Sequence, residues 1–138
     1  MYKRQAIGNH TYNHLNGWKN ETKNYLANVL ETEKTFQLYN FPAFQLKLFR
    51  PPYGKIKKAQ AKKLQKAGYK IIMWDVLSAD FDTAISKEKC LQNVLKNAKK
   101  GSIIVFHDSI KAKERVEFTL PKVLAYFSKK EYTFNVIK

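Results

Sequence analysis

The feature that most constrains the fold is an alternation of short apolar runs with longer stretches whose apolar residues recur at helical spacing. The short runs predict strands, at residues 46–49, 70–74, 102–106 and 132–137. The longer stretches predict helices, at residues 21–39, 56–67, 87–99 and 120–129. Strands that alternate with helices and read as nearly continuous apolar runs are typical of a parallel sheet covered by helices. The sequence therefore predicts an α/β fold.

Residues with known preferences for helix ends support these boundaries. Gly68 and Gly101 predict the ends of the second and third helices. Ser86 is a candidate N-cap for the third helix, and Thr119 for the fourth, with Pro121 tolerated in its first turn. The residues predicted to face the core of the first three helices are Leu26, Val29, Leu30, Phe36, Ile56, Ala59, Leu64, Ala67, Leu91, Val94, Leu95 and Ala98.

Length and composition indicate one folded domain over residues 1–138. Apolar residues make up 44% of the chain, and no linker, repeat or low-complexity segment interrupts it. No apolar run approaches the roughly 20 residues of a membrane span, and Met1–Arg4 leads into polar sequence without a recognisable secretory signal. The single cysteine, Cys90, excludes an internal disulfide and a cysteine-based zinc site.

The net charge of +15 raises the question of a polyanionic partner. The chain has 26 basic residues, but only Arg4, Arg50 and Arg115 are arginines. Proteins that recognise bases and phosphates usually depend on the bidentate guanidinium. The lysines are also scattered along predicted helix faces, so a solvated basic surface is favoured over nucleic-acid binding.

Two of the three histidines, His10 and His14, are four residues apart. On a helical turn they share a face, and both imidazoles can reach one metal ion. Two ligands are too few for tight zinc binding, and a third ligand, typically a carboxylate, is needed. Surface histidines at this spacing are also common, so the spacing alone leaves both interpretations open.

Other polar residues follow the predicted strands, where the sites of parallel α/β folds gather. The segment from Arg50 to Gly54 directly follows residues 46–49 and has a path restricted by two prolines; it suits either an anion clamp or an ordinary turn. His107 ends the run 102–106 and is placed for general acid or base chemistry. Asp75 and Asp80 follow the run 70–74, and either can orient a histidine, although a turn role is favoured for Asp75.

Taken together, these segments resemble the polysaccharide deacetylase family, carbohydrate esterase family four, which shares the NodB homology domain. The family has five motifs in order: Thr-Phe-Asp-Asp, His-(Ser/Thr)-x-x-His, Arg-Pro-Pro-Tyr, an Asp-Trp pair and Leu-x-His. The last four are matched at His10–His14, Arg50–Tyr53, Asp80-Phe81 and Val105–His107, with Gly8-Asn9 as the usual lead-in.

The chain departs from the family pattern at three places. Phe81 replaces the usual Trp, which keeps an aromatic wall but loses an N–H donor. Val105 replaces Leu. The Thr-Phe-Asp-Asp motif, which supplies a base and a metal ligand in the family, is absent, and only nine residues precede His10. We therefore hypothesise a truncated or mis-started chain, to be checked by sequencing upstream of Met1.

The resemblance implies a metal side of the site. His10 and His14 are expected to bind a divalent metal ion, usually zinc, and Arg50 to keep the base carboxylate ionised by pairing with it. The backbone N–H of Tyr53 is expected to help stabilise an oxyanion.

The resemblance also implies an acid side. His107 is expected to protonate the departing amine while Asp80 holds its tautomer, and Phe81 and Val105 are expected to line the substrate pocket. The catalytic assignments are thus His107, Asp80 and Arg50, and the substrate-binding assignments are Tyr53, Phe81 and Val105.

The family fold is an irregular (β/α) barrel, of which this chain is expected to lack the N-terminal side. The implied activity is hydrolysis of N-acetyl groups from amino-sugar polymers or oligomers, with an N-acetylated glycan as partner. Family members often act at the cell envelope, which gives weak support for that location. The alternatives are an inactive remnant or sugar-binding module that keeps the cleft, and a nucleic-acid-binding domain suggested only by charge.

Overall fold

The computed structural model describes residues 6–39 and 46–137, which form two compact units. The first contains the described residues up to Met73 together with 136–137, and the second contains Trp74–Asn135. Each unit has a core of its own. The prediction of one catalytic domain stays a prediction. The prediction that Met1–Arg4 carries no recognisable secretory signal concerns residues outside the described ranges.

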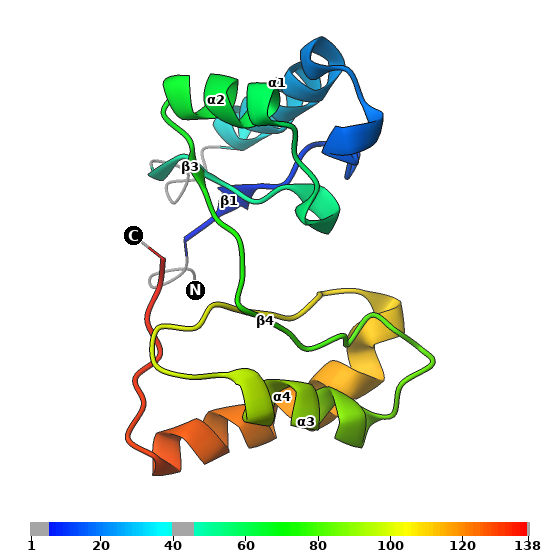
Figure 1. Ribbon diagram of the computed structural model, residues 1–138, viewed down its shortest axis with the longest axis vertical. Coiled ribbons are helices and arrows are strands. Elements are labelled where there is room, and N and C mark those ends of the chain that lie inside the picture. The colour runs from blue at the N-terminus through cyan, green and yellow to red at the C-terminus, as the bar shows by residue number, and fades with distance from the viewer. Residues whose placement is uncertain (1–5, 40–45, 138) are drawn as a thin grey trace. The chain divides into compact units, whose positions relative to one another are not determined.

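The first unit is a three-stranded parallel sheet with two helices. The strands β1 (Gly8–Asn9), β2 (Leu48–Phe49) and β3 (Lys70–Ile71) pair in that order. The helices α1 (Thr22–Leu38) and α2 (Lys58–Lys66) lie side by side on this unit, and short 3₁₀ turns occur at η1 (Gly17–Lys19) and η3 (Pro52–Gly54) (Figure 1).

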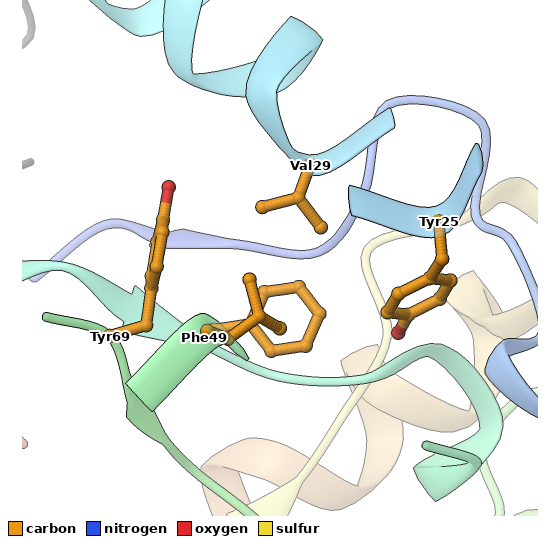
Figure 2. Packing of buried hydrophobic residues seen from close by; sticks show 5 residues of the cluster. Tyr25, Val29, Phe49 and Tyr69 are labelled. Carbon is orange, nitrogen blue, oxygen red and sulfur yellow. The ribbon is translucent and has the colours of Figure 1, made fainter. Parts of the chain in front are cut away.

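The core of the first unit is aromatic. Phe49 on β2 packs edge-to-face against Tyr25 of α1, with ring centres 6.2 Å apart, and against Tyr69, at 6.1 Å (Figure 2). Val29 and Leu64 complete the buried cluster. Such pairs add about 0.5–1.5 kcal/mol each beyond the area they bury, so this cluster fixes β2, and with it Arg50, beneath α1.

The second unit is a two-stranded parallel sheet with two helices. The strands β4 (Val76–Leu77) and β5 (Ile104–Val105) pair directly. The helices α3 (Lys87–Asn97) and α4 (Lys113–Lys129) lie side by side, and a 3₁₀ turn, η4 (Ile110–Ala112), precedes α4 (Figure 1). The cluster of Val76, Val94, Val123 and Phe127 forms the core.

Several local predictions are confirmed. All sheet pairings among the described residues are parallel. Ser86 caps α3 by accepting the N–H of Lys89 at 3.1 Å. Gly68 follows the end of α2 with φ of +87°, a backbone conformation that glycine adopts without a steric penalty. Gly101 has φ of +83° but lies in a turn after α3, which already ends at Asn97, so its predicted role at the helix end is wrong.

Other predictions need correction. Helix α4 begins at Lys113 rather than at residue 120, so Thr119 and Pro121 lie inside it. The run 70–74 forms a strand only at 70–71, and β1 and β4 were not predicted. No strand forms at 132–137, a range that lies wholly within the described residues.

The inward faces of two helices also differ from the prediction. Ala59 and Ala67 are exposed on α2, where Gln60 is buried beside Leu64. Gln60 is buried because its side-chain amide donates to the Gly17 carbonyl at 2.9 Å and its Oε1 accepts the Lys57 N–H at 2.9 Å. Leu30, predicted to face the core from α1, is 54% exposed.

Gly17 is the point where η1 meets the segment after η3. Its N–H donates to the Lys55 carbonyl at 3.0 Å. A Cβ at this position would overlap that carbonyl oxygen and lie 2.6 Å from Gln60 Oε1. Only glycine therefore allows the two segments to approach this closely.

Candidate functional site

The candidate residues of the first unit gather where β1 and β2 end. The parallel register pairs Asn9 with Phe49, which places the next residues, His10 and Arg50, at the same edge of the sheet. The Arg50 N–H donates to the Asn9 carbonyl at 2.9 Å. The two polar residues thus lie side by side because their strands end in register.

His10 and His14 do come together, but not on a helical turn. Thr11 and His14 have φ of 61° and 53°, which a helix does not allow. The loop is held instead by Asn9, whose Oδ1 accepts the Thr11 N–H at 3.0 Å, and by Thr11, whose Oγ1 accepts the Leu15 N–H at 2.9 Å. The two imidazole centres lie 4.9 Å apart.

Helix α1 anchors this histidine loop. The buried amide of Asn9 donates to the Val29 carbonyl at 2.8 Å, and the Tyr12 N–H donates to the Asn28 carbonyl at 3.2 Å. The Asn28 side chain accepts the N–H of Asn13 at 2.9 Å. Both exposed imidazoles therefore stand on a loop with a rigid support.

The geometry of the two histidines suits a metal ion. His10 Nδ1 lies 2.6 Å from the Arg50 carbonyl oxygen, which orients the ring. Two imidazoles bound tetrahedrally to one zinc ion, with Zn–N of about 2.0–2.1 Å, hold their ring centres about 5 Å apart. The observed 4.9 Å agrees with that value. Within residues 6–39 and 46–137, however, no three His, Cys, Asp or Glu side chains converge on one point. The described residues could therefore supply two ligands of such a site, His10 and His14.

Arg50 and Tyr53 flank the histidines. The Arg50 Nε donates to the Ile72 carbonyl at 3.3 Å, and burial lowers the pKa of its guanidinium. Tyr53 has φ of 59°, and its exposed ring packs edge-to-face on His14 with centres 4.7 Å apart. The prolines before Tyr53 are buried, so the loop holds this strained residue in place.

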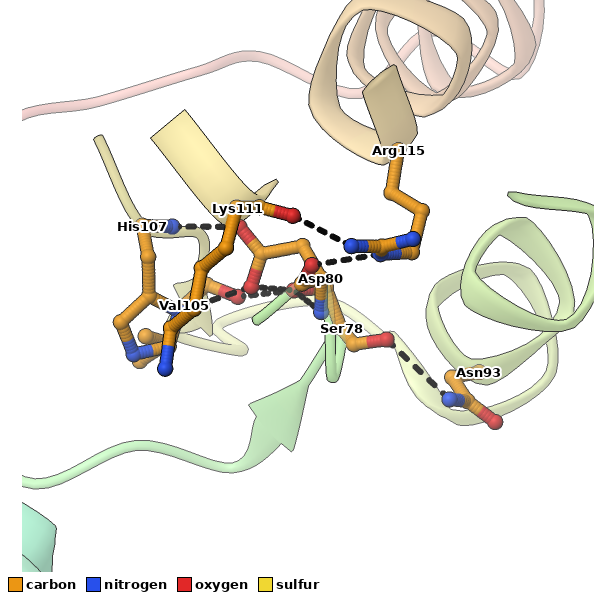
Figure 3. Close-up of polar contacts among 7 residues, drawn as sticks. All are labelled: Ser78, Asp80, Asn93, Val105, His107, Lys111 and Arg115. Atoms are coloured by element: carbon orange, nitrogen blue, oxygen red, sulfur yellow. Dashed lines mark hydrogen bonds and ion pairs between the residues drawn. The ribbon is translucent and has the colours of Figure 1, made fainter. Parts of the chain in front are cut away.

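The second unit contains a hydrogen-bonded pair of Asp80 and His107. The register of β4 with β5 pairs Leu77 with Val105, so the loops that follow both strands leave from the same edge. Asp80 is fully buried and accepts two hydrogen bonds from His107: the backbone N–H at 2.6 Å and Nδ1 at 2.7 Å (Figure 3). The imidazole is 39% exposed. Because a carboxylate only accepts, Nδ1 carries the proton and Nε2 remains available.

Phe81 contacts the imidazole of this pair, and Val105 lies on the strand that leads to His107. The Phe81 ring packs edge-to-face on His107, with centres 4.9 Å apart, and the ammonium of Lys111 lies 5.9 Å from the same ring. Val105 is 7% exposed and belongs to β5. Asp75, for which a turn role was favoured, accepts the Ile103 N–H at 2.8 Å and so ties the start of β4 to β5.

Two residues that the sequence did not single out hold Asp80. The buried hydroxyl of Ser78 lies 2.9 Å from Asp80 Oδ1 and 2.7 Å from the Val105 carbonyl (Figure 3). The Nε of Arg115 donates to the Asp80 carbonyl at 2.7 Å. The sequence offered one sign that Arg115 has a special role: it is one of only three arginines among the 26 lysine and arginine residues.

Comparison with known proteins identifies the family of these residues. The model of the polysaccharide deacetylase family matches residues 1–72. A peptidoglycan-N-acetylglucosamine deacetylase of Bacillus cereus is 33% identical over 132 residues, covering 95% of this chain and 61% of the relative. A chitooligosaccharide deacetylase of Azorhizobium caulinodans is 30% identical, covering 75% of this chain and 48% of the relative. The chain thus spans less than two thirds of these relatives.

Solved structures agree on the fold. The structure of a peptidoglycan N-acetylglucosamine deacetylase matches with a TM-score of 0.86 at 29% identity, covering 96% of this chain and 61% of that protein. A pseudoenzyme of the same esterase family from Bacillus anthracis matches with a TM-score of 0.70 at 23% identity, covering 94% and 43%. The predicted fold class, that of the α/β deacetylases of carbohydrate esterase family four, is confirmed.

Proposed function

The chain belongs to the polysaccharide deacetylase family, and on this premise we propose that the whole protein hydrolyses N-acetyl groups of amino-sugar polymers or oligomers in a metal-dependent reaction. The observation that carries the proposal is the pair of Asp80 and His107. A buried carboxylate that bonds Nδ1 of a half-exposed imidazole is the arrangement of an oriented general acid.

The metal side of the proposed site is His10 and His14, with the ring spacing described above. A divalent ion bound there supplies Lewis-acid polarisation of the acetamide carbonyl and a water of lowered pKa. The backbone N–H of Tyr53 is proposed to donate to the oxyanion, and Arg50 to pair with the carboxylate that activates the water. Neither that carboxylate nor a third metal ligand has an assigned residue in this sequence.

The acid side completes the reaction. Water adds to the acetamide carbon, the C–N bond breaks, and the amino sugar leaves as the amine after taking a proton from His107 Nε2. Asp80 keeps the other proton on Nδ1 throughout. Phe81 and Val105 are proposed to line the pocket for the sugar and acetyl group, so acetate and a free amino sugar are the products.

The test is acetate release from N-acetylglucosamine oligomers by the whole protein, measured with and without added zinc. Metal-stimulated release of acetate with formation of free amino groups is expected. An absence of acetate, with zinc bound and the protein folded, contradicts the proposal.

A second candidate is a non-catalytic protein that binds the glycan. It is favoured by the lack of three convergent metal-ligating side chains within the described residues. It predicts that the protein binds the oligomers, measured by calorimetry, and releases no acetate at any metal concentration.

A further inference from the structure

Arg115 reaches from α4 into both loops that carry the Asp80–His107 pair. Its Nε donates to the Asp80 carbonyl at 2.7 Å, and its Nη2 donates to the Lys111 carbonyl. The first acceptor lies in the loop after β4, and the second in the segment after β5, four residues beyond His107. Figure 3 shows the guanidinium reaching both carbonyls.

The two loops are thus joined twice. The Asp80 carboxylate joins them by accepting both hydrogen bonds from His107. Arg115 joins them again by donating hydrogen bonds to a main-chain carbonyl in each loop. It therefore positions the backbone and does not contact the reacting atoms. A fork with two donors in one plane is suited to holding two carbonyls at a fixed separation.

Arg115 also places a positive charge beside a buried negative one. Asp80 is fully buried, and Arg115 is only 8% exposed. The neighbouring thiol of Cys90 senses both charges: burial raises the pKa of Cys90, the Asp80 charge raises it further, and the Arg115 charge opposes that rise.

The use of arginine at this position is selective. Among the described residues only Arg50 and Arg115 are arginines, in a chain of 26 basic residues. Both donate to the backbone carbonyl of a residue that follows a strand: Arg50 to Ile72, after β3, and Arg115 to Asp80, after β4. The other members of the Lys and Arg set within the described residues are all lysines, which supply charge without a fork.

We propose that Arg115 is a positioning residue for deacetylation: it holds the Asp80 and His107 loops at the separation at which the carboxylate orients the imidazole. This inference rests on the proposed function, since it assigns Arg115 to the acid side of that reaction. A purely structural role would instead lower the stability of the second unit without altering the His107 ring in the folded protein.

The experiment compares Arg115→Met, which keeps the length of the stem, with Arg115→Lys, which keeps the charge but loses the fork. Lys113→Met is the matched control, because Lys113 is exposed on the same helix and its ammonium lies 3.9 Å from the carboxylate of Glu117. The readouts on the whole protein are kcat and KM for acetate release, the ¹⁵N resonances of the His107 ring and the thermal unfolding midpoint.

We expect Arg115→Met to lower kcat about tenfold to a hundredfold with KM changed by less than about twofold, since small displacements of a positioned group cost this much. The His107 Nδ1 resonance should move toward that of an imidazole without a carboxylate partner. Arg115→Lys should recover part of the loss in kcat, and Lys113→Met should match the wild type.

The inference is overturned if Arg115→Met keeps kcat within about twofold of the wild type and leaves the His107 resonances in place. It is also overturned if Met and Lys variants lose stability and activity together with unchanged ring resonances. If Arg115→Met does not fold, Arg115→Lys is the deciding variant. A lowered kcat together with shifted His107 ring resonances supports the inference, and wild-type values of both overturn it. If the wild type releases no acetate, the proposed function fails, and the ring resonances alone still test Arg115.

Discussion

The two histidines of the first unit show how single residues create a candidate metal site. Their rings meet because Thr11 and His14 adopt left-handed conformations that cost free energy and that Asn9 and α1 hold in place. The i, i+4 spacing indicated a shared face, and the rings do share one. It could not indicate the loop conformation, which depends on contacts with Val29 and Asn28, about fifteen to twenty residues away.

Replacing either histidine tests the metal assignment. His10→Ala and His14→Ala should each weaken zinc binding by more than about a hundredfold, since losing even an outer partner of a ligand costs 10–100-fold. Competition with a chromophoric chelator measures the affinity of the whole protein. His107→Ala is the control and should retain the metal; loss of zinc in this variant would contradict the separation of roles.

Removing the charge of Asp80 tests the acid side. Asp80→Asn cannot keep the Nδ1 proton of His107 in place through an ionised acceptor, so kcat for acetate release should fall by about 10²–10⁴-fold, the usual worth of general acid catalysis. Asp82→Asn is the matched control, because Asp82 Oδ1 accepts the Ala84 N–H in a turn that asparagine also forms. Equal effects of the two substitutions would argue against the assignment.

At the scale of elements, end signals were easier to predict than strands. Ser86 and Gly68 act through local backbone geometry, and each lies at the helix end that it predicted, whereas α3 ends at Asn97, four residues before Gly101. The strands β1 and β4 are two residues long, and their pairing partners lie far along the chain, so no local pattern reveals them. The start of α4 was missed because its buried face carries Arg115 and Thr119, which interrupt the apolar period.

The cap of α3 gives a direct stability test. Ser86→Ala removes the acceptor for the Lys89 N–H and should lower the free energy of unfolding by about 1 kcal/mol, the typical worth of an N-cap. Urea unfolding measures the change. Ser128→Ala, at an exposed position late in α4, should stay within about 0.5 kcal/mol of the wild type.

The packing of Tyr69 against α1 predicts a loss of stability at alkaline pH. Burial raises the pKa of the Tyr69 phenol above its ordinary value of 10.0, with the Glu33 charge adding to the effect. As the pH rises through about 10, the unfolded chain therefore loses this proton first, and the free energy of unfolding falls. Tyr69→Phe should reduce that fall without abolishing it, because burial also raises the pKa of Tyr25.

Urea unfolding at pH 8 and pH 11 measures this difference. Tyr12→Phe, at an exposed side chain, is the matched control. An alkaline loss in Tyr69→Phe as large as that of the wild type would show that the buried phenol does not cause it.

At the scale of the whole molecule, the sequence predicted the class of fold and the position of its polar residues. His10, Arg50, Asp80 and His107 all follow parallel strands, as the α/β pattern requires. The described helices include none long and apolar enough to cross a lipid bilayer. The division into two compact units was not predicted, since no change of composition marks the chain at Trp74.

The net charge of +15 predicts a dependence of stability on salt. Repulsion among like charges opposes the compact state, and salt screens it, with a Debye length of about 10 Å at 0.1 M. The urea midpoint should therefore rise between about 0.02 and 0.3 M NaCl. A midpoint that falls over this range would mean that attractive surface pairs outweigh the repulsion.

The close approach at Gly17 has a consequence for reading mutational data. Alanine at this position would push η1 away from the segment that follows Tyr53, and the histidine loop lies directly before η1. In an alanine scan, Gly17→Ala would therefore lower activity as the candidate site residues do, although Gly17 has no side chain that could take part in the reaction. Relatives that carry a larger residue here must route the segment at 54–56 differently, so positions 17 and 54–56 are expected to vary together in evolution.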